Sequence, residues 1–521
     1  MLAVVSGKQG GVIDMVNYGD VELFDVHAAG TLQSSQFRSP LHNQLVYFDP
    51  TNTSELVADL AKSWTLSDDG SKYTFVIHDN ASWWDGAPLT ATDVAFSINR
   101  WIEPGEPRPR TGLLRPYIDR AEAVDAATID IHLKYASAAL LQLMGVDFML
   151  ILPESQKDQG FERFEDVMGS GPFMVKEWQR GSFYEFERNP NYFKEGLPYL
   201  DGYISNTIVD AGTIVAGFKT ERLMMSSTTV MNISVEDVVE LEKEPNLTAY
   251  YTKTATLGDI IMNTNDEVWS NADLRKALWL ALDRWEFQDT FGAGKNAVGA
   301  PFIPDQWYSY TTEELKQFPG FGGCDGCPRT KQQDIDEAVE LMKKAGYDPP
   351  SSIGKLTLSS FTAAGYPDFM ALFKEQMKRN LGLEIELVIK DLASTNPEHI
   401  SGNYTLGGSG YGINILDPDD FLNAQFMPTD RAWSRWQPPP EYVEWFNQQS
   451  AELDREKRKE TLRKIEDYLL TGDGHGNIIF YWKPFYNVVN NKIKTAAGGY
   501  VVPDTIQTAV GSTVEHIWIE E

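Results

Sequence analysis

The alternation of apolar and polar residues along this chain predicts a mixture of strands and helices. Two short stretches alternate as half-buried strands do, Tyr73–Ile77 and Thr128–Leu133. Longer stretches repeat apolar residues at the helical period, and they are Leu274–Arg284, Asp334–Lys344, Phe369–Leu381 and Arg455–Leu470. The third of these ends before Gly382, and a strand pattern, Leu383–Ile389, follows it directly. Helices and strands joined by such short links predict an α/β fold.

Polar capping residues mark where two of the helices begin. Asn271 precedes an apolar stripe that predicts one uninterrupted helix. The stripe consists of Leu274, Leu278, Ala281, Leu282 and Trp285. Thr90 precedes another helix, with Asp93 three residues later in the carboxylate position of a capping box. Because turn signals and the strand at Tyr73–Ile77 lie just before Thr90, this part of the chain is a small α/β module.

An ordered series of short motifs fills the module between Leu56 and Arg100. Its pieces are Ser63-Trp64, the turn Asp68-Asp69-Gly70, Trp84-Asp85-Gly86 and Leu89-Thr90-Ala91 followed by Asp93-Val94. This order resembles the signature segment of the family 5 extracellular solute-binding proteins. A second block, between Gly169 and Phe193, is similar to the family pattern GTGPY, EW and ERNPDYW. Members of this family are receptors of ABC importers for peptides, nickel, opines and some oligosaccharides.

The resemblance implies an α/β fold with two lobes, of the periplasmic-binding-protein type. An extra subdomain in the first lobe (cluster C type) and a ligand in the cleft between the lobes are expected. The core of lobe I corresponds to residues 1–43, 172–264 and 482–521, the extra subdomain to 44–171, and lobe II to 265–481. Strands near Asn263–Asn265 and Tyr481–Lys483 would join the lobes, and ligand binding would close them by a hinge.

The acidic composition excludes some partners. The chain has 45 Lys and Arg against 75 Asp and Glu, a net charge of -30. This charge repels nucleic acid and anionic membrane surfaces. No apolar run approaches the roughly 20 residues of a membrane span, and Met1–Val5 is too short for the apolar region of a signal peptide. Together with the resemblance, these observations lead us to expect an extracytoplasmic monomer, either in the periplasm or lipid-anchored on the outer face of the membrane. Its expected partners are a small-molecule ligand and ABC permease subunits, and no cofactor or metal is expected.

Motifs of common catalytic classes are missing from the sequence. It contains neither a GxxxxGK[ST] phosphate loop nor an HExxH zinc motif. Ser409 lies in Gly407-Gly408-Ser409-Gly410, which misses the GxSxG spacing of a nucleophile elbow by one residue. The sequence therefore predicts a binding protein and not an enzyme. The alternative from a different class is a secreted acidic hydrolase with a carboxylate pair.

One segment resembles the ligand-facing GWxxD of the family, and it reads Gly410-Tyr411-Gly412-Ile413-Asn414. Tyr411 keeps the aromatic face and adds a hydroxyl. Asn414 stands where peptide binders place the Asp that pairs with the α-ammonium of the ligand. A neutral amide leaves a buried ammonium without its anion. We therefore expect a ligand that lacks a free α-amine or that presents hydroxyls to Tyr411 and Asn414.

The acidic cluster Asp417-Pro418-Asp419-Asp420 has two interpretations. It is either turn chemistry or a source of carboxylate for a ligand ammonium, with Asp417 foremost. The stretch Ser359–Gly365, where peptide binders can place an Arg for the ligand carboxylate, contains no base. Both charged anchors of a short peptide are thus missing, and peptide, opine and oligosaccharide all stay open as ligands.

Further contacts with the ligand are expected from two other places. Gly30 and Leu32 follow Leu23–His27, which resembles the LDPH of the family, and are candidates for backbone contacts. Trp433 and Trp436 lie in a polar loop close to the proline run at 438–440. They either line the cleft or pack against that run.

The two cysteines, Cys324 and Cys327, lie in a glycine-rich loop. A CxxC pair can be redox-active, bind metal or form a small disulfide. Two thiolates do not complete a tetrahedral zinc site, and no His or further Cys is near in sequence. Because an exported protein meets an oxidising compartment, we expect a disulfide in a surface loop.

Overall fold

The computed structural model describes residues 7–17, 19–21, 23–49, 52–106, 108–226, 233–362, 365–427, 435–471, 474–497 and 514–520. The chain packs into two compact units. Unit 1 consists of Met1–Thr254, Asn414–Leu416 and Phe485–Glu521, and unit 2 of Ala255–Ile413 and Asp417–Pro484. The lobe and subdomain boundaries expected from the sequence stay a prediction. Two long strands, β12 (Leu247–Met262) and β17 (Asn477–Asn490), contain residues of both units.

In the main sheet of unit 1, the first strand of the chain is an inner strand. Its strands stand in the order β8 (Phe173–Gln179), β9 (Phe183–Arg188), β10 (Gly202–Thr207), β1 (Val12–Asn17), β11 (Met225–Ser226) and β17. β1 runs parallel to β10, with Val12 opposite Gly202. Ile13 and Met15 point into an apolar core that also contains Phe37 of α1 (Leu32–Arg38). These two side chains therefore bury one face of β1 in the core of unit 1.

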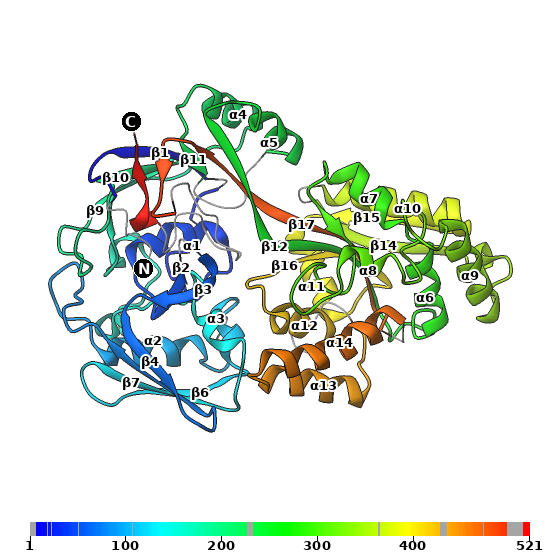
Figure 1. Ribbon diagram of the computed structural model, residues 1–521, viewed down its shortest axis with the longest axis horizontal. Coiled ribbons are helices and arrows are strands. Elements are labelled where there is room, and N and C mark those ends of the chain that lie inside the picture. The colour runs from blue at the N-terminus through cyan, green and yellow to red at the C-terminus, as the bar shows by residue number, and fades with distance from the viewer. Residues whose placement is uncertain are drawn as a thin grey trace. The chain divides into compact units, whose positions relative to one another are not determined.

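A smaller antiparallel sheet forms within residues 61–133 of unit 1. Its order is β4 (Ala61–Leu66), β5 (Lys72–Ile77), β7 (Thr128–Leu133) and β6 (Ile118–Ala123). The helix α2 (Ala91–Trp101) packs against β6 and β7 (Figure 1). The predicted capping box is present, because the N–H of Thr90 donates to Asp93 at 2.9 Å. Both predicted strands and the predicted helix start are confirmed.

One helix that was predicted from the sequence packs on the sheet of unit 2. The strands follow the order β15 (Glu384–Lys390), β14 (Lys355–Phe361), β16 (Leu406–Gly412) and β12. β14 is parallel to β15 and β16, and β16 is antiparallel to β12. The apolar face of α10 (Tyr366–Leu381) is buried against this sheet. Gly382 ends α10 in the left-handed conformation that glycine tolerates, with φ of 68°.

The remaining elements complete the two units. Those of unit 1 are β2 (Val46–Asp49), β3 (Asn52–Ala58), α3 (Leu140–Met144), α4 (Ala211–Lys219), α5 (Val235–Leu241), β18 (Ile493–Lys494) and β19 (Trp518–Ile519). Those of unit 2 are α6 (Ala272–Ala281), α7 (Arg284–Phe291), β13 (Ala297–Val298), α8 (Thr312–Leu315), α9 (Lys331–Lys344), α11 (Leu392–Ser401), α12 (Pro418–Phe426), α13 (Pro440–Ala451) and α14 (Arg455–Thr471). Across the described part of the chain, no helix combines the length and apolar character that a membrane crossing requires.

The prediction of one uninterrupted helix from Leu274 to Trp285 is wrong. Asn271 caps α6 as expected, but α6 ends at Ala281. The carboxylate of Asp283 accepts hydrogen bonds from the N–H groups of Trp285 (3.1 Å) and Glu286 (3.2 Å) and begins α7. A short acidic side chain competes in this way with the helical bonds of the backbone. The apolar stripe continued across the break, so periodicity alone did not reveal it.

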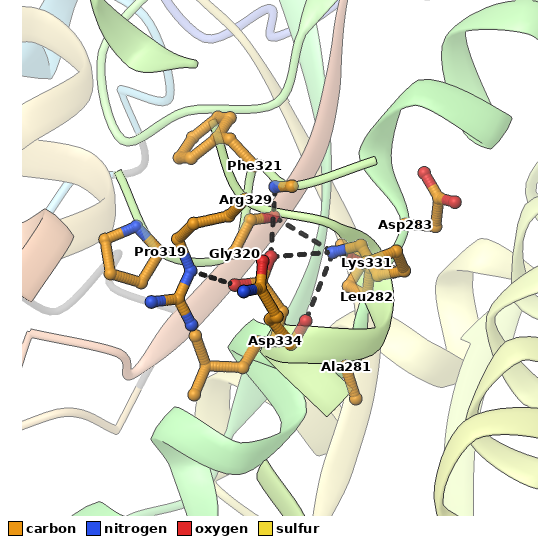
Figure 2. Close-up of polar contacts among 12 residues, drawn as sticks. Ala281, Leu282, Asp283, Pro319, Gly320, Phe321, Arg329, Lys331 and Asp334 are labelled. Atoms are coloured by element: carbon orange, nitrogen blue, oxygen red, sulfur yellow. Dashed lines mark hydrogen bonds and ion pairs between the residues drawn. The ribbon is translucent and has the colours of Figure 1, made fainter. Parts of the chain in front are cut away.

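A buried lysine joins the glycine-rich loop to the end of α6. Lys331 Nζ donates to the carbonyl oxygens of Leu282 (2.9 Å) and Gly320 (3.3 Å), as Figure 2 shows. The carboxyl end of a helix has carbonyls without helical partners and favours a cation. Burial lowers the pKa of Lys331 to about 8, and the Asp334 carboxylate opposes this shift.

Asp334 of α9 holds the rest of the same loop. Its carboxylate accepts from the N–H of Gly322 (3.0 Å) and from Arg329 Nε (2.7 Å), the second of which is visible in Figure 2. Within this loop, Cys324 and Cys327 form a disulfide. The loop is thus positioned by charged side chains that do not depend on the sulfur bridge.

We predict that replacing both cysteines by serine costs little stability. In the chain-entropy view, a bridge that closes so short a loop contributes at most about 2 kcal/mol. Urea denaturation should show a loss no larger than this. The single variant Asp334→Asn, which weakens the bonds of the loop to α9, is the comparison and should cost at least as much. A serine variant that fails to fold would contradict the prediction.

Candidate ligand-binding site

Glycines in β16 bring the predicted ligand-facing segment close to α10. A Cβ atom at Gly410 would lie 1.6 Å from Tyr366 Oη, and one at Gly408 would lie 2.2 Å from Met370 Sδ. Neither distance leaves room for a side chain. β16 also pairs with β12 over its whole length, up to Gly412 opposite Thr256. The glycine-rich run is therefore a packing requirement and not a nucleophile elbow.

The hydroxyl of Tyr411 is oriented within unit 2. Tyr411 Oη donates to Asp420 Oδ1 at 3.0 Å, and Asp420 is only 5% exposed. Tyr411 and Gly412 are themselves half-buried. An aromatic ring with a fixed hydroxyl can offer a stacking face and a polar edge to a bound molecule.

The carboxylate of Asp417 forms an ion pair inside unit 2. Its carboxylate receives Arg458 Nη1 at 2.5 Å and Nη2 at 2.6 Å, and both side chains are buried. It also accepts from the N–H of Asp419 at 3.0 Å and so caps α12. Asp419 in turn accepts hydrogen bonds from Ser450 and Gln449. These contacts support the turn interpretation of the acidic cluster, because the carboxylates of Asp417 and Asp419 are engaged inside unit 2.

Asn414 belongs to unit 1, where it meets an arginine. Its side chain is buried, and its Oδ1 accepts a hydrogen bond from Arg110 Nη1 at 2.8 Å. Arg110 Nε donates to the carbonyl of Gly30 at 3.0 Å. The guanidinium lies 5.3 Å from the ring centroid of Phe148. Gly30 and Asn414 were proposed separately from distant parts of the sequence, and both accept hydrogen bonds from the side chain of Arg110.

The other predicted contacts lie in packed surroundings. Leu32 is 6% exposed and belongs to the apolar core of unit 1. Trp436 is 5% exposed in unit 2, and its ring lies 5.1 Å from that of Tyr442 and 6.2 Å from that of Phe426. This burial agrees with the packing alternative for Trp436, against aromatic rings rather than prolines. Trp433 lies outside the described residues.

Two arginines near Arg110 are paired with acids. Arg100 donates to both oxygens of Asp25, at 2.9 Å and 2.5 Å. Burial alone would raise the pKa of Asp25, but the bonds and charge of Arg100 lower it to about 2. Arg108 lies 3.2 Å from Glu103. The block resembling LDPH therefore anchors α2 through its Asp.

Sequence reasoning missed Arg110. The residue lies in the stretch Trp101–Arg120, whose prolines and glycines hide any strand or helix period. The remaining signal was the pair Arg108 and Arg110 in a strongly acidic chain. That signal identifies no role until the fold brings Asn414 beside it.

One group among the described residues has the composition of a metal site. Ligand atoms of Glu122, Asp130 and His132 lie within 4.8 Å of one another on β6 and β7. Lys72 Nζ lies 2.6 Å from Asp130, and His132 Nε2 lies 2.8 Å from Glu122. Because Lys72 already neutralises Asp130, contacts between neighbouring side chains account for this group.

β12 carries a buried carboxyl group at the position that pairs with Ser409 of β16. Asp259 is opposite Ser409 in the sheet, and Asn477 Nδ2 donates to its Oδ2 at 3.2 Å. Burial raises the pKa of Asp259 to about 7, against the effect of the bonds from Ser409 and Asn477. The folded protein therefore holds a proton here at a pH where the unfolded chain has lost it.

We predict that Asp259→Asn removes a pH dependence of stability. Between pH 4 and about 7 the folded state binds more protons than the unfolded state, so the free energy of unfolding falls as the pH rises. The slope is about 1.4 kcal/mol for each pH unit. Calorimetry at pH 5, 6, 7 and 8 should show a flatter profile for Asp259→Asn than for wild type. Asp325→Asn, in an exposed loop, should leave the slope unchanged, and equal slopes for all three proteins would contradict the assignment.

We predict that Asp417→Ala is severely destabilising. It leaves the buried guanidinium of Arg458 without its anion, and such a loss typically lowers the free energy of unfolding by about 3 to 5 kcal/mol. Urea denaturation of Asp417→Ala and of the exposed control Asp325→Ala measures the difference. A variant of normal stability that has lost only ligand affinity would show that Asp417 acts on the ligand instead.

Comparison with known proteins agrees with this fold. The chain is 23% identical over 475 residues to the oligopeptide-binding protein OppA of Bacillus subtilis, covering 86% of this chain and 82% of that protein. It is 25% identical over 409 residues to heme-binding protein A of Haemophilus influenzae, covering 74% and 71%. It is 24% identical over 463 residues to the glutathione-binding protein GsiB of Pectobacterium atrosepticum, covering 87% and 84%.

Solved structures show the same architecture over the full length. OppA of Haemophilus influenzae in complex with the peptide RPPGFSPFR has a TM-score of 0.78 at 21% identity and covers 99% of each chain. AgaA of A. tumefaciens in complex with agropinic acid has a TM-score of 0.78 at 20% identity and covers 98% of this chain and 99% of that one. The predicted α/β binding-protein fold is confirmed. Since the model of the bacterial extracellular solute-binding proteins, family 5, matches residues 55–433, the chain belongs to that family.

Proposed function

We propose that this protein is the extracytoplasmic receptor of an ABC importer. It captures a small organic solute and delivers that solute to the permease subunits. The observation that carries the proposal is the family match over residues 55–433. The likeness of the whole fold to binding proteins solved with a peptide and with agropinic acid supports it.

The ligand is a peptide or a related polar molecule, with an opine or an oligosaccharide as the alternatives. Relatives are named for oligopeptide, heme and glutathione, so the scaffold itself does not choose among these classes. We assign ligand contact to Tyr411, whose hydroxyl is oriented by Asp420, and a positioning role to the buried Asn414, whose Oδ1 is bound to Arg110. The hydroxyl of Tyr411 suits a molecule that offers hydroxyl or carbonyl groups.

A contact between a serine and a histidine in unit 2 bears on the hydrolase alternative. Ser359 Oγ lies 3.0 Å from His399 Nε2, beside an open groove of about 450 Å³. Burial lowers the pKa of His399 to about 4, so the imidazole is neutral as a base must be. The hydroxyl is only slightly exposed, since Ser359 has 8% of its surface accessible. We therefore assign the contact to packing of α11 on β14.

We predict binding without turnover. Native mass spectrometry of the purified protein should detect one retained small molecule per chain. That compound should stabilise the protein against heat by mass action, by about 2.7 kcal/mol at a hundredfold excess over Kd. Incubation with peptide and glycoside libraries should leave every compound intact. Hydrolysis by wild type that disappears in Ser359→Ala would establish the enzyme alternative and refute the receptor-only function.

A further inference from the structure

Three arginines of unit 1, Arg100, Arg108 and Arg110, differ in their partners among the described residues. Arg100 pairs with Asp25, and Arg108 pairs with Glu103. For Arg110, the structure shows no carboxylate at ion-pair distance within the described residues. The two hydrogen-bond acceptors that the structure shows for Arg110 are both neutral, in a protein whose total charge is -30.

Neutral groups hold this charged side chain in one position. Arg110 donates to the carbonyl of Gly30 and to the amide oxygen of Asn414, and its guanidinium carbon lies 5.3 Å from the centroid of the Phe148 ring. A Cβ at Gly30 would come within 3.1 Å of Pro109 Cγ, so glycine permits the close approach of this segment. The side chain is half-buried and has lost much of its rotational freedom before any ligand arrives.

The hydrogen bonds of Arg110 leave a donor edge open. A guanidinium has five N–H donors, and these two contacts use one on Nε and one on Nη1. Both hydrogens of Nη2 and one of Nη1 remain. Such an edge matches the two oxygens of a carboxylate, and the bonds that it forms to an anion are charge-assisted.

We infer that Arg110 binds a carboxylate of the ligand and that Asn414 positions the guanidinium for it. This inference rests on the proposed function and names the chemical class of its solute, an organic acid. A ligand ammonium at this place would be repelled by the fixed positive charge. From the sequence alone, Asn414→Asp would restore the carboxylate that peptide binders use for the ligand ammonium. The structure opposes this, because the new carboxylate would lie beside Arg110 and neutralise it.

The alternative is that Arg110 only ties Asn414 to Gly30. Arg284 shows that an arginine can have such a role, since it donates to the carbonyls of Trp279 and Gly320 while fully buried. The two roles differ in one measurable respect. If Arg110 only ties Asn414 to Gly30, its loss changes the affinity for every ligand equally. If Arg110 is an anion site, its loss changes only the affinity for ligands that carry an acid group.

Matched probes separate these roles. The set consists of N-acetyl-trialanine as the free acid and as the amide, trialanine amide as the cation, and maltobionate with maltose as a sugar acid and its neutral parent. Each is titrated by calorimetry, up to about 10 mM, into wild type, Arg110→Met, Asn414→Asp and Arg120→Met. Arg120 is an exposed arginine, 53% accessible, and controls for the loss of one positive charge. Thermal melts of all four proteins show whether the variants are folded.

Wild type and Arg120→Met should bind at least one acid at least about tenfold more tightly than its neutral counterpart, and should bind the cation most weakly. Arg110→Met and Asn414→Asp should lose that preference while they keep the affinity for the neutral form. An equal loss for acid and neutral forms in Arg110→Met would overturn the inference in favour of the tie. So would a wild type that binds none of the acids or that prefers the cation. Binding without acid preference leaves the receptor function intact, whereas hydrolysis of the probes would refute that function itself.

Discussion

The close approach of β16 to its neighbours is the constraint on which the candidate site depends. Gly408 and Gly410 leave no space for a Cβ atom, because Met370 and Tyr366 of α10 occupy it. On the other side, β12 pairs with β16 from Leu406 to Gly412. This packing holds the end of the strand, and with it Tyr411, in place within unit 2.

The treatment of charge differs between the framework and the candidate site. In the framework, several buried charges have opposite charges in direct contact, as Asp417 has Arg458 and Asp25 has Arg100. Such pairs offset the cost of removing ions from water. Arg110 is bound only to neutral oxygens, which orient a guanidinium without neutralising it. An orientation without neutralisation is what a site for an anion requires.

The same contrast explains why the fold alone does not name the solute. Relatives with the same architecture are named for oligopeptide, heme and glutathione, at 23 to 25% identity. One framework can carry many different surfaces. In the site that we propose, specificity depends on a few side chains such as Tyr411 and Arg110.

The sequence by itself determined the α/β class, the positions of several helices and strands, the capping box at Thr90 and the family. These follow from local periodicity and short-range motifs, which act over a few residues. It did not reveal the break at Asp283, because an apolar stripe can run across two helices as well as along one.

Only the tertiary structure decided what the polar candidates do. Asp417 and Arg458 are 41 residues apart in the chain, and Arg110 and Asn414 are 304 apart. Whether a carboxylate serves a buried arginine or a ligand, and whether an arginine is neutralised, depends on which groups the fold brings within about 3 Å. Sequence proximity carries no information about such pairs, so Asp417 stood out and Arg110 did not.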